Sequence, residues 1–579
     1  MKRNLNFMFV GGIALGLGYL FLKFSLYLAA TRIYQVDECE SVFVARILAD
    51  GQAANYSSSV TLLHWPLIWL AQGATRSTEL FASARCFMLL VFWLNILLLA
   101  LATGERLLSR RFLIALAGAA TLAPLWDYGF EIRHDNLLLT GLLLFWCAVR
   151  QVPAKMSSCI IAGAITITLE FVAFKAFVYT IPLSFLALFF PRSGSVSRWK
   201  LVFAWIAGAL GMFLILRVAY GMAGLWPLFS SDIESLFLYS VGDNHRFPPW
   251  ATLERLLTQT PLLMAMLLAG LITVVTDLIR RRKMALTWDG WLPETFLLAI
   301  AFAALMINPT PFAYNLLNLV PFIFLFVFRY AALFLKDAWA SPVWCPLLIS
   351  VFTFAHLVPF GIVTRRHLNW TNQRQEQLMW LAEDLTDPVK DHVYDGIGLV
   401  PTRTSINFHW FLHSFIVQNF KSGTWPTVSE MLAARPASVI IPSYRTDWLP
   451  AADHEFITNR YVSVADDFWV LGKVLPESGG EFQIYQPGRY RIATLAGSDL
   501  VGTYPGGVQG AIQPSIKGEV AGTLDGAALT NQQVTLTVGA HRIACATNCQ
   551  PTVVWLGPKL DRIGRQGDSS HQRLFVNWY

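Results

Sequence analysis

The sequence predicts a polytopic α-helical membrane protein that ends in an extracytoplasmic region of α/β and β-sandwich structure. Of its 579 residues, 55% are hydrophobic and only 14% are charged, whereas soluble globular proteins carry roughly a quarter charged residues. Apolar runs long enough to cross a bilayer, about 20 residues each, recur as far as residue 364. Beyond that residue the apolar runs are shorter and alternate with polar positions, which is typical of a soluble domain.

The apolar runs predict about eleven membrane spans. They lie near residues 7–28, 81–103, 112–127, 135–151, 157–172, 174–191, 201–220, 258–278, 292–308, 312–331 and 343–363. The fifth and sixth spans have no clear loop between them, in the stretch from Leu169 to Phe177. Merging these two spans would invert the orientation of every later segment.

The distribution of basic residues predicts the orientation, because cytoplasmic loops of membrane proteins collect Lys and Arg. Alternate loops of this chain do so: Lys2 and Arg3; Arg106, Arg110 and Arg111; Arg150 and Lys155; Arg192, Arg198 and Lys200; Arg280, Arg281, Arg282 and Lys283; Arg329 and Lys336. We therefore expect a multi-pass protein of a bacterial inner membrane, with a cytoplasmic N-terminus and a periplasmic C-terminal region. These loops also account for the net charge of +7, so we expect no nucleic-acid partner.

The change of pattern after the last span predicts two further domains. We divide the chain into a transmembrane domain at 1–364, an α/β domain at 365–478 and a β-sandwich, similar to carbohydrate-binding modules, at 479–579. The α/β domain begins with helical periodicity at 372–385 and contains a strand-like run at 437–444. The last domain alternates apolar and polar residues between frequent turns, as β-sandwiches do.

The seven cysteines follow the same division. Cys545 and Cys549 lie in the last domain, where a disulfide is expected in an oxidising periplasm, and no second pair of soft metal ligands lies nearby. The other five lie in or beside the spans, and we expect them to pack as small apolar residues. Four aromatic residues of the last domain either pack in its core or stack on sugars: Tyr485, Tyr490, Trp555 and Trp578.

Three groups of charged residues fall at the predicted outer face of the spans. A charge at membrane depth is costly, and it usually faces a cavity or a partner. The groups are Asp37, Glu38 and Glu40; Glu131 to Asn136; and Glu170 with Lys175. Each group has a structural alternative: acids that cap a helix beginning near Ser41, a polar cap on a helix start, and an ion pair between helices, respectively.

The acidic pair Asp37–Glu38 directly follows the first span, and a long outer loop and many spans follow the pair. This arrangement resembles the GT-C membrane glycosyltransferases, in particular the branch of protein O-mannosyltransferases and the aminoarabinose transferase of lipid A. Further segments within the first 330 residues agree: Ala45–Gln52, Leu62–Leu70 with Pro66 and Leu67, Ser83–Leu90 with Arg85, Ile132–Leu139 with an Arg-x-Asp element, and Asn308–Phe326 with Tyr314. Two positions depart from the lipid A enzyme, since His64 replaces a phosphate-contacting lysine and Glu40 replaces an arginine.

The resemblance implies a GT-C-like fold and an inverting enzyme on the extracytoplasmic face. Such an enzyme would move a sugar from a polyprenyl-phosphate donor, held in membrane lipid, to a hydroxyl of an envelope glycolipid or polysaccharide such as lipopolysaccharide. One carboxylate would serve as general base, and we expect this base to be Asp37, with Glu38 shaping the site. Candidates for holding the donor phosphate are Arg46, His64, Arg85, Arg133 and Lys175, and candidates on the acceptor side are Glu40, His134, Asp135 and Tyr314.

The chemistry requires no cofactor, and the resemblance implies metal-independent action. A divalent ion could be held by Asp37, Glu38, Glu40 and His64, but no ligand motif with fixed spacing supports one. Three other functions are open: a protein O-glycosyltransferase of the same fold, a transporter or flippase of lipid-linked sugars, and a non-catalytic scaffold. The two halves of the membrane region lack the internal similarity that many transporters show.

Overall fold

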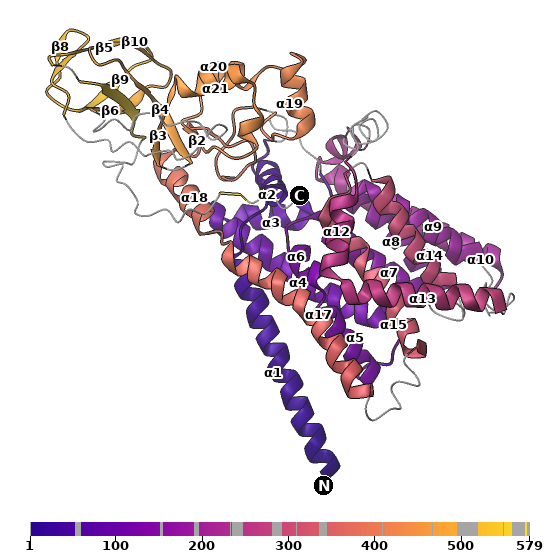
Figure 1. The fold of residues 1–579 in the computed structure, drawn as a ribbon. Helices are drawn as coiled ribbons and strands as arrows, with labels where there is room; N and C mark the ends of the chain where they lie inside the picture. Colours follow the sequence, from indigo (N-terminus) through magenta and orange to yellow (C-terminus); the bar gives the residue numbers. More distant parts are fainter. Residues whose placement is uncertain are drawn as a thin grey trace.

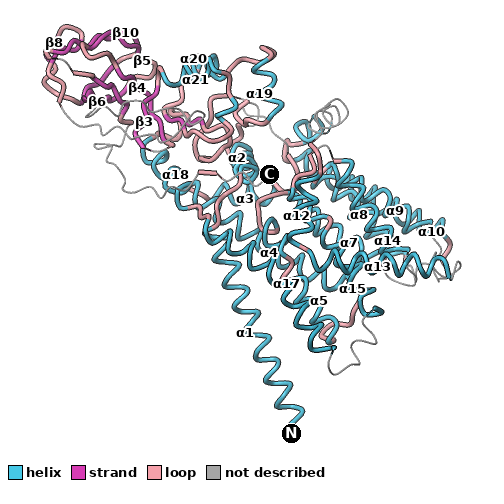
Figure 2. Tube along the Cα trace, viewed as in Figure 1, coloured by secondary structure: helices cyan, strands magenta, loops and turns pink. Residues whose placement is uncertain are grey.

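The computed structural model describes residues 2–52, 60–150, 155–189, 196–231, 233, 247–280, 292–308, 310–334, 344–407, 409–465, 467–494, 519–547, 549–557 and 574–575. Several residues singled out in the sequence lie outside these ranges: Trp578, Arg192, Arg281, Arg282, Lys283 and Lys336. The first part of the chain is helical, and the described strands all lie in the C-terminal part, at the opposite end of the molecule from α10 and α13 (Figure 1 and Figure 2).

The helical part follows the predicted apolar runs closely. Its helices are α1 (Lys2–Thr31), α2 (Val36–Ala49), α3 (His64–Gly73), α4 (Ser77–Ala102), α5 (Arg110–Ala120), α6 (Ala123–Tyr128), α7 (His134–Val149), α8 (Met156–Val172), η2 (Phe174–Ala176), α9 (Phe177–Phe189), α10 (Arg198–Met222), α12 (Trp250–Gln259), α13 (Pro261–Arg280), α14 (Leu292–Ile307), η3 (Ala313–Asn318), α15 (Val320–Phe334) and α17 (Trp344–Asn369). The third predicted span is divided between α5 and α6. The fifth and sixth are separate helices, α8 and α9, joined by the 3-10 turn η2.

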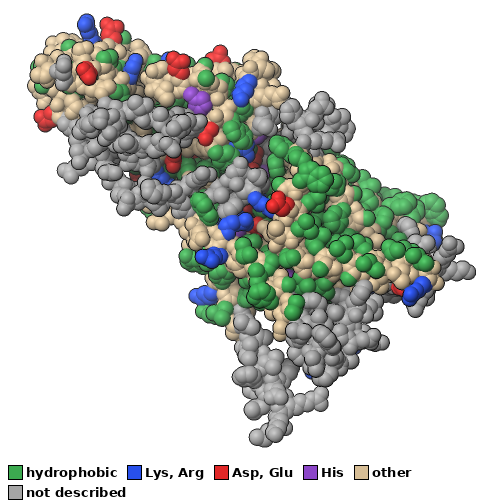
Figure 3. Space-filling view, in the orientation of Figure 1, with side chains coloured by type: hydrophobic (Ala, Val, Ile, Leu, Met, Phe, Trp, Pro, Cys, Tyr) green, Lys and Arg blue, Asp and Glu red, His purple; other side chains and the backbone are tan. Residues whose placement is uncertain are grey.

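Four helical segments within the described ranges are long and apolar enough to cross a membrane, judged by length and composition: Ser77–Ala102, Arg198–Met222, Pro261–Arg280 and Ala313–Tyr330. Shorter apolar helices accompany them, so the total of about eleven spans stays a prediction. Large apolar side chains such as Phe203, Ile215 and Ile272 are exposed on α10 and α13, and Figure 3 shows hydrophobic side chains covering much of the helical part. An apolar surface of this extent is expected to face lipid.

Two glycines allow the backbones of α8 and α10 to touch. A Cβ atom on Gly163 would lie 2.0 Å from the backbone oxygen of Trp205, and one on Gly208 would lie 2.0 Å from the backbone oxygen of Ile160. No other residue fits at these distances without moving a helix. Membrane helices commonly use small residues in this way, because close packing replaces the hydrophobic effect as the force between them.

The described C-terminal residues form two sheets. The strands are β1 (Val393–Tyr394), β2 (Val439–Ile440), β3 (Tyr461–Ala465), β4 (Phe468–Val474), β5 (Gly479–Ile484), β6 (Gly488–Thr494), β7 (Gly522–Leu524), β8 (Ala527–Ala528), β9 (Gln533–Leu536), β10 (Gly539–Cys545) and β11 (Pro551–Trp555). The larger sheet has the order β1-β2-β4-β11-β6-β9, with β3 also beside β4, and the smaller has the order β5-β10-β7-β8. The accompanying helices are α18 (Gln373–Leu385), α19 (Ser414–Lys421), α20 (Val428–Ala434), η4 (Thr446–Trp448) and α21 (Ala451–Thr458).

The larger sheet crosses the boundary predicted between the α/β domain and the β-sandwich. β4 pairs with β11 in a register that places Val474 opposite Thr552, so strands on both sides of residue 478 belong to one sheet. The division of the chain into three domains stays a prediction. The disulfide predicted between Cys545 and Cys549 is present.

The C-terminal part is anchored to the segment that follows α1. The side chain of Gln375 on α18 accepts from the backbone N–H of Tyr34 (2.7 Å) and donates to its carbonyl (2.9 Å). The backbone N–H of Asn372 donates to the carbonyl of Thr31 (2.8 Å). Apolar side chains from both parts share one buried cluster. The start of α2, which carries the acidic pair, therefore lies at the junction of the helical and C-terminal parts.

Candidate active site

The two adjacent acids at the start of α2 have opposite environments, and Glu38 is the structural one. Its side chain is completely buried, and it accepts hydrogen bonds from Nε (3.0 Å) and Nη2 (2.7 Å) of Arg85. It also accepts from the backbone N–H groups of Gln35 (2.8 Å) and Ile132 (3.1 Å). Burial opposes ionisation, but the Arg85 guanidinium holds the pKa of this carboxyl below its ordinary value. Glu38 is thus a fully bonded carboxylate inside the fold.

The side chain of Arg85 is also held by contacts within the protein. Its buried guanidinium donates to the carbonyls of Arg32 and Ile33, the latter at 2.8 Å. It also lies over the ring of Tyr34, 4.3 Å from the ring centroid. These contacts tie α4 to the segment after α1. Since its donors are used within the protein, Arg85 is poorly placed to hold a donor phosphate.

Asp37 begins a chain of alternating charges, Asp37–Arg133–Asp135–Lys175, which we call the charge array. Arg133 forms ion pairs with Asp37 and with Asp135, the second with Nε 3.3 Å from Oδ2, and Lys175 forms an ion pair with Asp135. The Arg133 guanidinium also lies 3.6 Å from the ring centroid of Tyr314. The inner members are buried, whereas Asp37 and Lys175 each keep 29% of the side chain exposed. The array therefore presents one carboxylate and one ammonium group at its accessible ends.

The members of the array come from the ends of separate helices. Asp37 lies in the first turn of α2 and Asp135 in the first turn of α7, positions where the helix dipole favours a negative charge. Lys175 lies in η2, the break between α8 and α9, and Tyr314 lies in η3 before α15. Interruptions in the apolar helices thus supply the polar side chains of the site.

Two further predicted donor-phosphate residues, Arg46 and His64, lie outside the array, as Arg85 does. Arg46 donates to the carbonyls of Ala71 and Ala74, both at 2.9 Å, and pairs with Asp50 at 2.9 Å, so it joins α2 to the end of α3. His64 is buried at the start of α3, and burial lowers its pKa to about 4. A neutral imidazole provides no charge to a phosphate near pH 7.

The remaining predicted acceptor-side residues surround the array. His134 precedes Asp135 on α7, with Nε2 3.8 Å from the Asp135 carboxylate and 40% of its side chain exposed. Glu40 is half-buried on α2, three residues after Asp37, so the two lie on neighbouring positions of one helix face.

The ion pair expected between Glu170 and Lys175 is wrong. Glu170 accepts a hydrogen bond from the hydroxyl of Thr180 (2.8 Å), while Lys175 pairs with Asp135 and lies 3.4 Å from Oδ1 of Asn315. The reason is the turn η2, which carries Lys175 to the start of α7. The sequence does not show this turn, because the apolar pattern is continuous through it.

The metal ligands considered in the sequence have other partners in the structure. Glu38 is bonded by Arg85, and the acids of the charge array are paired with Arg133 and Lys175. Within the described ranges, no group of three or more His, Cys, Asp and Glu side chains is arranged to hold a metal ion. The charges at this site are balanced by arginine and lysine side chains.

The C-terminal part contributes residues near Asp37 that the sequence did not indicate. Burial lowers the pKa of His413 to about 4, and the charges of Arg445 and Asp37 act on that histidine in opposite directions. The same two charges act on Tyr444. Arg445 lies over the ring of Trp448, 4.6 Å from its centroid. No local motif connects these residues to Asp37, because they come together only through the docking of the C-terminal part.

No known family profile matches the sequence, and no curated protein matches it. Three solved structures with a similar fold are forms of the Archaeoglobus fulgidus oligosaccharyltransferase. The AglB complex with an inhibitory peptide and a dolichol-phosphate has a TM-score of 0.45 and 13% identity, covering 74% of this chain and 70% of that chain. The form tethered to an acceptor peptide with the NVT sequon has a TM-score of 0.48 and 13% identity, covering 81% and 73%. The apo form has a TM-score of 0.47 and 12% identity, covering 91% and 76%. Likeness at this level assigns neither a fold family nor an activity.

Proposed function

We propose that the chain is a GT-C-type membrane glycosyltransferase. It transfers a sugar from a polyprenyl phosphate to a hydroxyl of an envelope glycolipid or polysaccharide on the extracytoplasmic face of a bacterial inner membrane. The single observation that carries this proposal is the charge array, whose accessible ends are a carboxylate and an ammonium group. Transfer from a lipid phosphate needs these two groups: a base for the incoming hydroxyl and a cation for the departing phosphate.

Asp37 is the general base in this proposal. As the acceptor oxygen bonds to the anomeric carbon, its proton passes to the Asp37 carboxylate, and the bond between that carbon and the phosphate oxygen breaks with inversion. A positioned base contributes about 10²–10⁴-fold to such a reaction. Glu38 cannot act as the general base, since its oxygens already accept hydrogen bonds from Arg85 and from two backbone N–H groups. It positions Asp37 by fixing the first turn of α2.

Lys175 and Arg133 hold the donor phosphate in this proposal. The phosphate gains charge as it leaves, and charge-assisted hydrogen bonds from cations in a partly dry site stabilise that charge. Lys175 is partly exposed, and Arg133 is kept in place by Asp135 and by the ring of Tyr314. Two carboxylates within the array hold both cations before the donor binds, so little reorganisation is needed during the reaction.

The test compares wild type with Asp37→Asn and with Asp50→Asn as a matched control. Asp50 is an exposed acid at the end of the same helix and pairs only with Arg46 among the described residues. Purified protein is incubated with labelled polyprenyl-phosphate sugars and either an envelope extract or a Ser/Thr-rich peptide. We expect transfer to the extract to fall about 10²–10⁴-fold in Asp37→Asn and to be retained in Asp50→Asn, with donor binding intact in both.

Three other outcomes would contradict parts of this proposal. Full transfer activity in Asp37→Asn would show that Asp37 is not the general base. Transfer to the peptide in preference to the extract would make the chain a protein O-glycosyltransferase. Movement of a lipid-linked sugar across reconstituted vesicles, with no transfer from any donor, would make it a transporter.

A further inference from the structure

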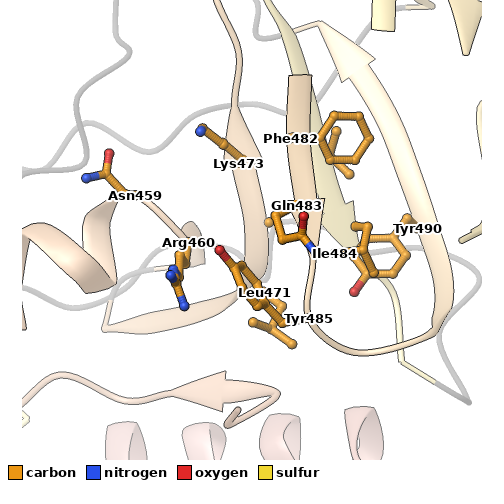
Figure 4. A pocket seen from close by; sticks show the side chains of 11 residues that line it. Asn459, Arg460, Leu471, Lys473, Phe482, Gln483, Ile484, Tyr485 and Tyr490 are labelled. Atoms are coloured by element: carbon orange, nitrogen blue, oxygen red, sulfur yellow. The ribbon is translucent and has the colours of Figure 1, made fainter. Parts of the chain in front are cut away.

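A polar cleft lies in the C-terminal part, between β4 of the larger sheet, the turn that follows α21, and β5 of the smaller sheet. It has a volume of about 360 Å³. Its polar lining is Asn459, Arg460, Lys473, Gln483, Tyr485 and Tyr490. Figure 4 shows Arg460, Lys473 and Gln483 around the same space. The cleft belongs to a different region from the charge array and plays no part in the proposed transfer.

Among the described residues that line this cleft, the charged side chains are all positive. Arg460 and Lys473 are both half-buried, and neither has an acidic partner among the described residues, nor does any Asp or Glu in that set line the cleft. The Arg460 guanidinium is held between two rings, 3.7 Å from the centroid of Phe456 and 4.1 Å from that of Tyr485. A cation that is held in place but lacks a counter-charge is suited to bind an anion, and a planar guanidinium matches a carboxylate.

The uncharged groups of the cleft are suited to hydroxyls. The side chains of Asn459 and Gln483 are exposed at its rim, and each amide offers both a donor and an acceptor. Sugar hydroxyls need this mixture, whereas a simple anion needs donors alone. The cleft also lies among strands that are far from the apolar helices α10 and α13 (Figure 1), so a headgroup within the bilayer is a poor match for its position.

We infer that this cleft binds an acidic saccharide, with the carboxylate of a uronic acid between Arg460 and Lys473 and the ring hydroxyls at Asn459 and Gln483. The ligand class is a carboxylated glycan outside the membrane. Such a site would keep an acidic envelope polysaccharide close to the protein independently of the reaction at Asp37. The inference therefore stands whether or not the proposed transfer is correct.

The experiment measures binding of fluorescein-labelled tetragalacturonic acid to the detergent-solubilised full-length protein by fluorescence polarisation. The variants are Arg460→Gln and Lys473→Gln, and the control is Lys421→Gln, an exposed lysine at the end of α19. Losing a charge-assisted hydrogen bond should weaken binding about tenfold in each cleft variant, and Lys421→Gln should bind like wild type. The binding should also weaken as salt is raised, because the cations are partly exposed.

Competition decides the nature of the ligand. Unlabelled tetragalacturonic acid should displace the probe at a far lower concentration than either cellotetraose or inorganic phosphate. Equal displacement by the uncharged cellotetraose would show that Arg460 and Lys473 do not bind the carboxylate of the ligand. Equal displacement by inorganic phosphate would reduce the cleft to a general anion site. If both cleft variants bind the probe with wild-type affinity and keep the thermal stability of the wild type, the saccharide does not bind in this cleft.

Discussion

Replacing Glu38 by Gln tests whether this carboxylate holds the site together. The substitution keeps the size of the side chain but removes its charge and turns one oxygen into an N–H donor. That donor would face the guanidinium of Arg85, which is itself buried. Removing one partner of a buried ion pair typically costs about 3–5 kcal/mol, because the other charge is left uncompensated. We expect a loss of this size in the free energy of unfolding.

The contrast with Asp37→Asn follows from the same structure. Asp37 makes its ion pair to Arg133 from a side chain that is 29% exposed, so water screens this pair more than the Glu38–Arg85 pair and brings its contribution toward the roughly 0–1 kcal/mol of surface pairs. Arg133 also keeps its second partner, Asp135. Two neighbouring acids should therefore differ by about 2 kcal/mol or more in their effect on stability, taking the difference between the two ranges.

The assay is reversible unfolding of the purified protein in mixed micelles with increasing SDS, followed by tryptophan fluorescence. A double-mutant cycle with Glu38→Gln and Arg85→Gln isolates the pair, and we expect the double variant to lose about 1–3 kcal/mol less than the sum of the single variants. Equal stability of Glu38→Gln and Asp37→Asn would refute the assignment of separate roles. Strict additivity in the cycle would refute the direct contact on which the assignment rests.

Three further predictions concern other parts of the chain. Gly208→Val should lower the unfolding temperature of the micellar protein, whereas Gly211→Val should not, because a Cβ at 208 meets backbone at 2.0 Å and one at 211 meets nothing within 4 Å. Lys175→Gln should lower kcat/KM for a polyprenyl-phosphate donor about tenfold and leave the KM for the acceptor unchanged in steady-state assays. Partial burial lowers the pKa of His541, but the hydrogen bond with Asp525 (2.7 Å) raises it above the ordinary value. The stabilisation from this pair is therefore complete below the unfolded pKa of about 6.5 and lost as pH rises through the folded value. In Asp525→Asn, histidine hydrogen–deuterium exchange read by mass spectrometry should report a lower pKa.

The positions of the helices could be predicted because the bilayer demands long apolar runs, and these are visible in the sequence. The disulfide between Cys545 and Cys549 could be predicted because the two cysteines are only four positions apart in the sequence. The sheet that crosses residue 478 could not be predicted in the same way. It depends on β4 pairing with β11, and the register between strands so far apart in sequence is set by tertiary packing.

The candidate site was only partly predictable. The acids after α1 and the Arg-x-Asp element at the start of α7 are visible as charges in an apolar context. Their pairing is not visible, and neither is the interaction of His413 with the charge of Asp37, because both depend on how distant segments dock. The predicted ion pair between Glu170 and Lys175 is wrong because a short 3-10 turn redirects the chain and brings Lys175 to Asp135. This turn does not interrupt the apolar pattern of the sequence.

The division of labour between Asp37 and Glu38 follows from helix geometry. Successive residues of an α-helix point about 100° apart, so two adjacent acids at the start of α2 must face different surroundings. Glu38 faces Arg85 and the backbone of Ile132, and its four accepted bonds fix the turn from which Asp37 projects. A base that is misplaced by about 1 Å can lose about 10²-fold in rate. Substitution of either acid should therefore lower transfer about 10²-fold or more, and the stability measurement distinguishes the residue that positions from the residue that accepts the proton.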